Sequence, residues 1–501
     1  MSIPKKLIKG AGISFAGKIT GTGVKYLTQL SLANFLDAEA FGFYALGLSI
    51  YQVVELFSRV GLEVGGVRYV SIHYSRKDIG RLKGILWQTL SLPFIIGIFF
   101  SIILWLTADS IAASLFDKPN LGAVLKMFAC SLPFGASVTA GSFATTGFQT
   151  TGIKALVWEF LLPLFNLSFI VCFHAAGFGL LGAVGAWVIS VILSLMILSF
   201  CILRVFPELL DRQIKPVFEI VRVILFSLPL SLGSFLWLVL VWTDILMLGY
   251  FRPASEVGIY RAASQTALLM TLLSSSLVSI FSPMIANFFS QEEFEAARKL
   301  FQKTVRWNFA LSMTLFLIVS VTSQDLLRVF GEEFEAGWLC LVILAAGQLT
   351  RAGAGGLAVH VLAMSGHQNL KLVGDLISAI MNIALNILLI PRWGILGAAV
   401  ATGLSLLSIN LIRLIQVNQV LGARDYEYGY LKTISISLIP AAMGLTIQAV
   451  LPSTHYLISA LLVSFTILGI YIPLLVSIAL DAEDRMALKK VANRLRYPPR
   501  L

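Results

Sequence analysis

The sequence predicts an all-α integral membrane protein with about fourteen transmembrane helices. Three observations support this fold class: 57% of the 501 residues are hydrophobic, only 13% are charged, and the mean hydropathy is +0.87. A soluble core does not need so much apolar surface, whereas each spanning helix takes about 20 apolar residues. A water-soluble enzyme is therefore excluded, and the chain is long enough for a dozen or more spans.

Apolar runs bounded by Gly, Pro or charged clusters divide the chain into fourteen predicted helices. The first contains Lys18 and Lys25 and has no small-residue cleavage site, so we interpret it as a helix and not as a signal peptide. The connections are short, and no soluble domain is expected. The predicted helices cover residues 8–36, 40–65, 82–107, 121–149, 152–175, 178–204, 222–250, 256–286, 299–322, 336–364, 368–390, 394–420, 429–451 and 455–480.

The distribution of basic residues predicts that both termini are cytoplasmic. With the N-terminus inside, 27 of the 37 Lys and Arg residues fall on the inner side of the predicted membrane, six fall outside and four fall within it. Cytoplasmic loops carry such an excess of positive charge. Topology thus explains the net charge of +11, and no nucleic-acid partner is needed. We expect a multi-pass protein of the plasma (inner) membrane.

Three sequence blocks recur in the same order, at offsets of 216, 219 and 215 residues. Chance similarity between Gly- and Ala-rich helices is the alternative, but three ordered blocks at nearly one offset favour duplication. Each repeat holds six spans, an even number, so the two repeats would be parallel, with helices 13 and 14 added. The paired blocks are FLDAEAFGFY (35–44) and FRPASEVGIY (251–260), ATTGFQ (144–149) and AMSGHQ (363–368), and GLLGAVGAWVIS (179–190) and GILGAAVATGLS (394–405).

The duplication predicts two six-helix lobes, at 1–210 and 211–424, followed by the additional helices at 425–480 and a cytoplasmic basic tail at 481–501. Parallel repeats of this kind are typical of transporters. Their substrate site lies near the membrane midplane between the two bundles.

Four motifs of the sequence are distinctive: TDILMLGYFRPASEVGIYRAA (243–263), FGEEFEAGW (330–338), MSGHQN (364–369) and a Pro-x-x-Gly-x-x-Gly-Ala-Ala pattern from Pro391 to Ala399. Together they resemble the Wzx/RfbX-like flippases of polysaccharide biosynthesis. The resemblance covers nearly the whole chain and implies the multidrug/oligosaccharidyl-lipid/polysaccharide exporter fold. It implies alternating-access transport of an undecaprenyl-diphosphate-linked oligosaccharide from the inner to the outer leaflet, for a cell-surface polysaccharide such as O-antigen or exopolysaccharide. Polysaccharide polymerase machinery would then be a partner, besides the membrane lipids.

Ionisable groups at membrane depth are costly unless they face a cavity or a partner, so each is a functional candidate. Lys18 and Lys25 share one polar stripe of the first predicted helix, which suits a lipid diphosphate. Arg59 adds forked donors for phosphate oxygens. The alternative is structural, because Arg59 could pair with Glu55 or Glu63 and Lys18 could snorkel to the interface.

Further candidates lie in the second half of the chain. Arg351 follows Gln348 by three residues and has no acid one turn away, whereas Asn382 and Asp375 share a polar stripe that could contact sugar hydroxyls. Arg261 lies near the outer end of its predicted helix, where an interface anchor is an equal alternative. The residues predicted to bind diphosphate or sugar are Lys18, Lys25, Arg59, Arg261, Gln348, Arg351 and Asn382.

Four acids, Glu55, Glu159, Asp244 and Asp375, are the candidates for coupling to H⁺ or Na⁺ or for gating. Intramembrane acids usually face a polar interior, and Glu159 and Asp375 fit a cavity or a structural role equally well. Asp244 could instead form an interhelical hydrogen bond or contact a gate.

No cofactor or metal site is expected. The segment from Gly12 to Lys18 imitates a phosphate loop, but Ile19 stands where Ser or Thr is required, so no ATP site is predicted. The four cysteines lie in apolar stretches without metal-ligand spacing and are interpreted as small core residues. They are Cys130, Cys172, Cys201 and Cys340.

Three other functions remain as alternatives to the flippase. A cation-coupled multidrug exporter of the same superfamily is the first, although buried Lys and Arg would repel cationic drugs. A membrane enzyme such as a polymerase or glycosyltransferase needs an acid/base constellation on a sizeable loop, and the loops are too short. A structural scaffold does not explain buried charge in both halves of the sequence.

Overall fold

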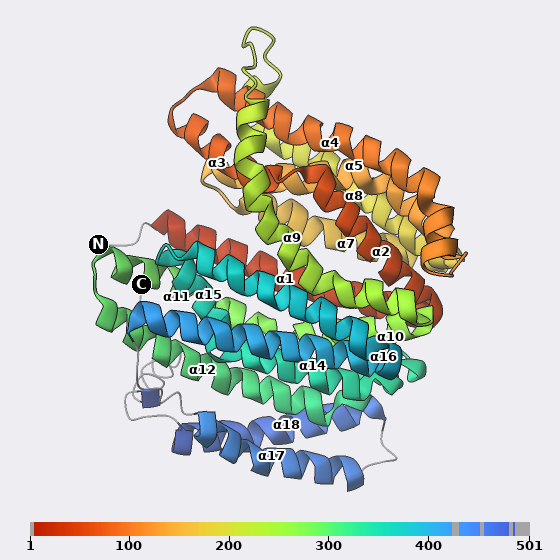
Figure 1. Ribbon diagram of the computed structural model, residues 1–501, viewed down its shortest axis with the longest axis vertical. Coiled ribbons are helices and arrows are strands. Elements are labelled where there is room, and N and C mark those ends of the chain that lie inside the picture. Colours follow the sequence, from red (N-terminus) through yellow and green to blue (C-terminus); the bar gives the residue numbers. More distant parts are fainter. Residues whose placement is uncertain (1–4, 423–429, 451–454, 480–483, 486–501) are drawn as a thin grey trace, which may run out of the picture. The chain divides into compact units, whose positions relative to one another are not determined.

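The computed structural model describes residues 5–422, 430–450, 455–479, 484 and 485, and these are almost entirely helical, with no strand among them (Figure 1). The predicted segments are helical over most of their described residues, which confirms the all-α fold. The α-helices are α1 (Lys5–Phe35), α2 (Ala38–Arg59), α3 (Leu62–Ser75), α4 (Ile79–Ser110), α5 (Leu121–Ala144), α6 (Gly152–Lys154), α7 (Leu162–Ala175), α8 (Gly179–Val205), α9 (Ile220–Phe251), α10 (Ala254–Leu268), α11 (Thr271–Ser290), α12 (Phe294–Val321), α13 (Ser323–Arg328), α14 (Trp338–Thr350), α15 (Gly356–Met364), α16 (Gln368–Leu421), α17 (Tyr430–Val450) and α18 (Tyr456–Leu474).

Among the described residues, eleven helices are long and apolar enough to cross a membrane. The number becomes twelve if the helix pair Ala254–Val278 and Phe281–Ser290, bent by 42°, forms one span. α16 covers the two predicted spans 368–390 and 394–420. The chain leaves helical geometry between them, at Gly394 (φ 54°, ψ −130°), so α16 consists of two helical arms. The total of fourteen spans and the cytoplasmic termini remain predictions.

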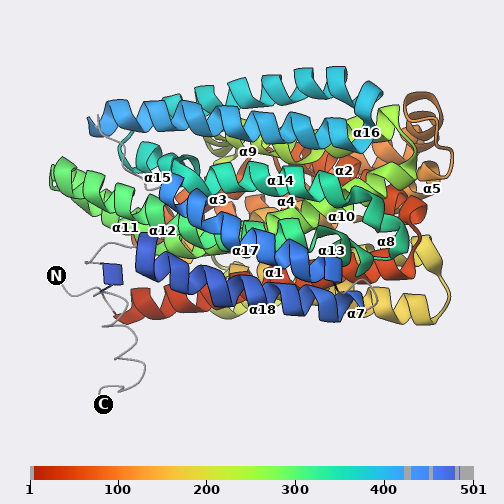
Figure 2. The same ribbon diagram turned by 90° about the horizontal axis from the view of Figure 1, so that it is seen from below.

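The chain divides into two compact units. Unit 1 comprises Met1–Gln265 and Asp375–Thr402, and unit 2 comprises Thr266–Gly374 and Gly403–Leu501. In unit 1, α4, α5 and α8 pack in succession, and α7 packs on α8. In unit 2, α17 and α18 lie side by side and both contact α12 (Figures 1 and 2). The lobe boundaries at residues 210 and 424 remain predictions.

Local sequence signals explain where several helices of unit 1 begin and end. The Asp37 side chain accepts a hydrogen bond from the Ala40 N–H (2.7 Å) and caps α2, as Asp78 does for α4. Such caps satisfy N–H groups that have no partner within the helix. Val60 and Gly61 both adopt left-handed backbone angles (φ 51° and 72°), and this pair separates α2 from α3.

Two glycines of the repeated blocks bring α2 and α10 into backbone contact. A Cβ atom on Gly42 would lie 1.8 Å from the Ala254 carbonyl oxygen, and a Cβ on Gly258 would lie 2.2 Å from the Ala38 carbonyl oxygen. Gly42 and Gly258 are 216 positions apart, as are Ala38 and Ala254. The contact is therefore reciprocal between equivalent positions of the two repeats, as expected for duplicated elements that face each other.

Replacing either glycine of this contact with alanine should destabilise unit 1. The added methyl group overlaps a backbone oxygen that cannot rotate away, so Gly42→Ala or Gly258→Ala should cost about 1–3 kcal/mol or more. Thermal unfolding of the detergent-solubilised protein, followed by tryptophan fluorescence, measures the effect. Gly233→Ala is the control, since nothing lies within 4 Å of its added Cβ. Equal unfolding temperatures for Gly42→Ala and the control would contradict the close approach.

Candidate functional site

Two lysines and one glutamate gather around an aromatic ring inside unit 1. The ammonium of Lys25 lies 4.6 Å from the centroid of the Trp158 ring. Lys154 Nζ lies 3.6 Å from Glu159 Oε1, 4.1 Å from the Phe143 ring centroid and 6.0 Å from that of Trp158. The other carboxylate oxygen of Glu159 is buried without a hydrogen-bond partner. We name these five residues the cationic cluster; it carries two positive charges and one negative charge.

A π-helical turn and a glycine assemble this cluster. Residues Ala155–Leu161 form the π-helical segment η3, which carries both Trp158 and Glu159. A Cβ on Gly21 of α1 would lie only 2.0 Å from the Glu159 carbonyl oxygen, so the two backbones touch at this point. Lys25 follows Gly21 by one turn of α1 and is thereby placed over the Trp158 ring.

Lys154 lies five residues before Glu159, a spacing that does not indicate a pair on an α-helix. On an α-helix, neighbours on one face are three or four residues apart. A π-helical turn brings residues five apart onto one face, and π-turns are frequent at functional sites. A Lys–Glu spacing of five beside Trp is the only sequence signal that could have indicated this pair.

Lys18 belongs to α1, but its side chain lies outside the described part of the structure. Arg59, at the end of α2, pairs with Glu55 at 3.5 Å, which is one of the two pairings that the sequence allowed. Glu55 is 4% exposed, and one of its oxygens has no hydrogen-bond partner. Both carboxylate oxygens of the buried Glu63 are also without a hydrogen-bond partner.

A second polar group in unit 1 surrounds Asp244 of α9, which is 3% exposed. Asn386 Nδ2 and Asn382 Nδ2 donate to Asp244 Oδ1 at 2.7 and 3.3 Å. The hydroxyls of Tyr260 and Thr402 both donate to Asp244 Oδ2. We name these five residues the Asp244 network. A carboxylate that accepts four hydrogen bonds is a strong acceptor site inside the membrane.

The network combines three segments that are distant in the chain. Tyr260 comes from α10, Asn382 and Asn386 come from the first arm of α16, and Thr402 lies after the break at Gly394. The sequence predicted that Asn382 contacts sugar. In the structure its Nδ2 donates hydrogen bonds to Asp244 Oδ1 and to Thr402 Oγ1 (3.1 Å). Asp375 lies on the same arm, two turns before Asn382, and is 7% exposed.

Arg261 is buried in unit 1, with 7% of its surface exposed, and does not lie at an exposed helix end. Its Nε donates to Gln29 Oε1 of α1 at 3.3 Å, and its guanidinium lies 4.6 Å from the Trp242 ring centroid. A cation stacked on an aromatic face in a desolvated site is stabilised by the ring quadrupole.

The remaining two predicted residues belong to unit 2. The Oε1 atom of Gln348 on α14 is buried without a hydrogen-bond partner. Arg351 is exposed and begins a π-helical turn, Arg351–Gly355, in which Gly353 departs from helical angles (ψ −145°). Asn308 Nδ2 donates to the Ala352 carbonyl at 2.7 Å within this break. The predicted cations thus fall into separate groups: Lys25 with Glu159, Arg59 with Glu55, Arg261 with Gln29, and Arg351 in unit 2.

Among the residues described, no group of three or more His, Cys, Asp or Glu side chains is arranged to hold a metal ion. The polar groups found here can instead hold an anion, in the cationic cluster, or a monovalent cation or proton, in the Asp244 network.

Comparison with known sequences identifies the family. The family model described as polysaccharide biosynthesis protein matches residues 7–289, and the MatE family model matches residues 229–391. The probable low-salt glycan biosynthesis flippase Agl15 of Haloferax volcanii is 29% identical over 186 residues, which are 36% of this chain and 38% of that protein. The chain thus spans little more than a third of the length of this relative.

Solved structures show the same fold. The lipid II flippase MurJ in an inward closed conformation has a TM-score of 0.69 at 14% identity, covering 91% of this chain and 97% of that one. An inward-facing multidrug resistance MATE family transporter of the MOP superfamily has a TM-score of 0.66 at 13% identity, covering 82% and 98%. The fold is thus that of membrane transporters and flippases, and the expected multi-pass membrane protein is confirmed. Because its family model matches more than half of the sequence, the chain belongs to the polysaccharide biosynthesis protein family.

Proposed function

We propose that this protein is a flippase that moves an undecaprenyl-diphosphate-linked oligosaccharide from the cytoplasmic to the outer leaflet by alternating access. The observation that carries the proposal is the cationic cluster, in which Lys154 pairs with Glu159 and Lys25 lies over the adjacent Trp158 ring. Such a cluster is costly in a membrane unless an anion completes it. A diphosphate supplies that charge, and the rings of Trp158 and Phe143 provide flat apolar surface beside it.

The relatives support the same substrate class. The family is one of polysaccharide biosynthesis proteins, and Agl15 is named as a glycan biosynthesis flippase. A carrier that must cross the bilayer with its sugars needs a site for the charged linkage, and the cationic cluster offers one. The sugars delivered in this way would serve a cell-surface polysaccharide.

A cation-coupled multidrug exporter is the second candidate function. The MatE match over residues 229–391 and the MATE-like fold favour it. The excess positive charge of the cationic cluster disfavours it, because that charge repels cationic drugs. Export of a cationic dye by vesicles that do not move a lipid-linked oligosaccharide would favour this second candidate.

We propose that the Asp244 network couples transport to an H⁺ or Na⁺ gradient. Its carboxylate is buried with amide and hydroxyl groups, a set of oxygen donors and acceptors that can hold a hard monovalent cation or a proton. The side chains come from both sides of the break in α16, so occupancy of the network would affect how the two arms are held.

Neutralising the cationic cluster should slow transport. Loss of a charge-assisted contact to phosphate costs about 1.5–3 kcal/mol, or about 10- to 100-fold in rate or affinity. We therefore expect Lys25→Gln and Lys154→Gln each to reduce movement of a fluorescent polyprenyl-diphosphate oligosaccharide across proteoliposomes, and Lys25→Arg to retain it. The readout is the fraction of label accessible to an external quencher.

Lys215→Gln is the matched control, since Lys215 is an exposed lysine of unit 1 that does not belong to the cluster. The control should transport normally. Wild-type rates in the folded double variant Lys25→Gln/Lys154→Gln would contradict the diphosphate site.

Removing the charge of Asp244 should abolish the response to the coupling ion. Asp244→Asn replaces a carboxylate oxygen with an NH₂ group that faces hydroxyl donors, so ion binding should be lost. We expect transport by wild-type protein to accelerate under an imposed Na⁺ or H⁺ gradient, and the gradient that accelerates it identifies the ion. Transport by Asp244→Asn should respond to neither gradient.

Thr402→Ser keeps the hydroxyl donor to Asp244 and should preserve the gradient response. A folded Asp244→Asn protein whose transport responds to the gradient as the wild type does would remove the network from coupling.

A further inference from the structure

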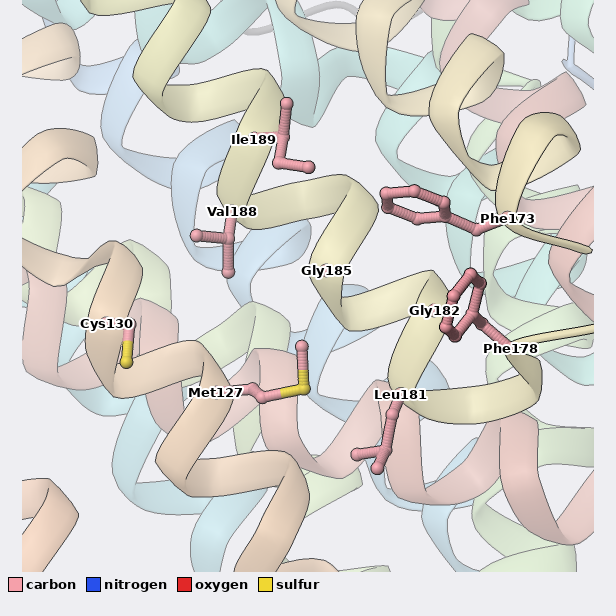
Figure 3. Close-up of a pocket in the computed structure, with 9 residues that line it drawn as sticks. All are labelled: Met127, Cys130, Phe173, Phe178, Leu181, Gly182, Gly185, Val188 and Ile189. Atoms are coloured by element: carbon pink, nitrogen blue, oxygen red, sulfur yellow. The ribbon is translucent and has the colours of Figure 1, made fainter. Parts of the chain in front are cut away.

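A wholly apolar pocket of about 470 Å³ lies in unit 1 where α5, α7 and α8 meet. In Figure 3, α8 passes between Met127 and Cys130 of α5 on one side and Phe173 and Phe178 on the other. The pocket lies on helices whose mean hydropathy reaches 1.5, 2.0 and 2.6, values typical of membrane spans. We therefore expect the exposed rim residues of the pocket, Phe178 and Leu181, to face hydrocarbon.

Two glycines of α8 create the depth of this pocket. Gly182 and Gly185 are three residues apart and present no side chain to it. A Cβ on Gly185 would meet only Met127 Cε at 3.4 Å and the Phe173 ring at 3.6 Å, which are ordinary van der Waals distances. A Cβ is thus accommodated at Gly185, and a larger side chain at this position would extend into the pocket.

A charged pair and a tryptophan lie beside the end of the pocket that Met127 lines. Lys126 directly precedes Met127, pairs with Asp109 at 2.6 Å and lies 5.5 Å from the Trp105 ring centroid. Trp and Lys of this kind mark the level of lipid headgroups. A lipid whose headgroup sits at this level would direct the first part of its chain along Met127 and Cys130.

We propose that this pocket binds the head-proximal part of the isoprenoid chain of a polyprenyl-diphosphate lipid. The inference rests on the proposed function and adds to it a site for the chain, separate from the cationic cluster. The volume corresponds to roughly fifteen heavy atoms at about 30 Å³ each, the size of three five-carbon isoprene units. The lining offers only apolar surface, which suits a hydrocarbon chain, and the proposed function supplies an isoprenoid as that chain.

The predicted topology gives this site a place in the transport cycle. The loop between α4 and α5 lies on the outer side if the N-terminus is cytoplasmic. The pocket then holds the chain in the outer half of the membrane, where the flipped product leaves the protein.

The test is photo-cross-linking in proteoliposomes with a polyprenyl diphosphate that carries a diazirine in the isoprene units nearest the diphosphate. We expect cross-links on peptides that contain Met127 and Cys130 and on the α8 peptide that contains Gly185. Gly185→Leu should reduce them about tenfold, because the new side chain displaces the buried isoprene carbons. Gly233→Leu is the control and should cross-link as the wild type does, since its side chain enters open space.

If Gly185→Leu does not fold, Cys130→Phe is the variant to test, because its side chain fills the same pocket from α5. It should reduce the cross-links in the same way. Equal labelling of the same peptides by a diazirine-bearing phosphatidylcholine would overturn selectivity for an isoprenoid. Cross-links confined to other helices, in vesicles whose wild-type protein moves a lipid-linked oligosaccharide, would overturn this site and leave the proposed function intact. Absence of such transport by wild-type protein would instead overturn the proposed function, while cross-links at the pocket would still support the site.

Discussion

Hydrocarbon offers no hydrogen bonds, so every polar group that enters the membrane with this chain needs a partner within the protein. Helices satisfy the backbone, and the described structure is accordingly almost entirely helical. The buried polar side chains show how far this requirement is met. Asp244 is buried and accepts four hydrogen bonds, whereas Glu159 keeps one buried oxygen without a hydrogen-bond partner. Both groups keep a buried oxygen without a hydrogen-bond partner, since Asn386 Oδ1 of the Asp244 network has none either.

The same constraint explains why departures from regular helix occur beside these groups. η3 changes the helical spacing so that Lys154 reaches Glu159, and the break at Gly394 lets one helical segment contribute to the Asp244 network from both arms. Such departures cost free energy, because they weaken backbone hydrogen bonds and require unusual angles. They persist where several side chains hold them.

The flippase proposal joins a charge-binding site and a chain-binding site within unit 1. In this proposal the cationic cluster binds the diphosphate, and the apolar pocket over Gly185 binds the isoprenoid chain. A lipid-linked substrate has both kinds of group, so a protein that moves it must satisfy both. A soluble cationic drug has neither the negative charge nor the long chain, which is why these two sites together favour the lipid-linked class.

The sequence by itself determined the membrane class and the helical segments, because hydropathy is a local property. It could not pair Lys154 with Glu159, since α-helical spacing places them on different faces until the π-turn forms. It also could not bring Tyr260, Asn386 and Thr402 to Asp244, or place Gly42 against Ala254. Those contacts join residues 16 to 212 positions apart. Only the tertiary structure decides them, because close backbone approach and helix breaks depend on how the helices pack.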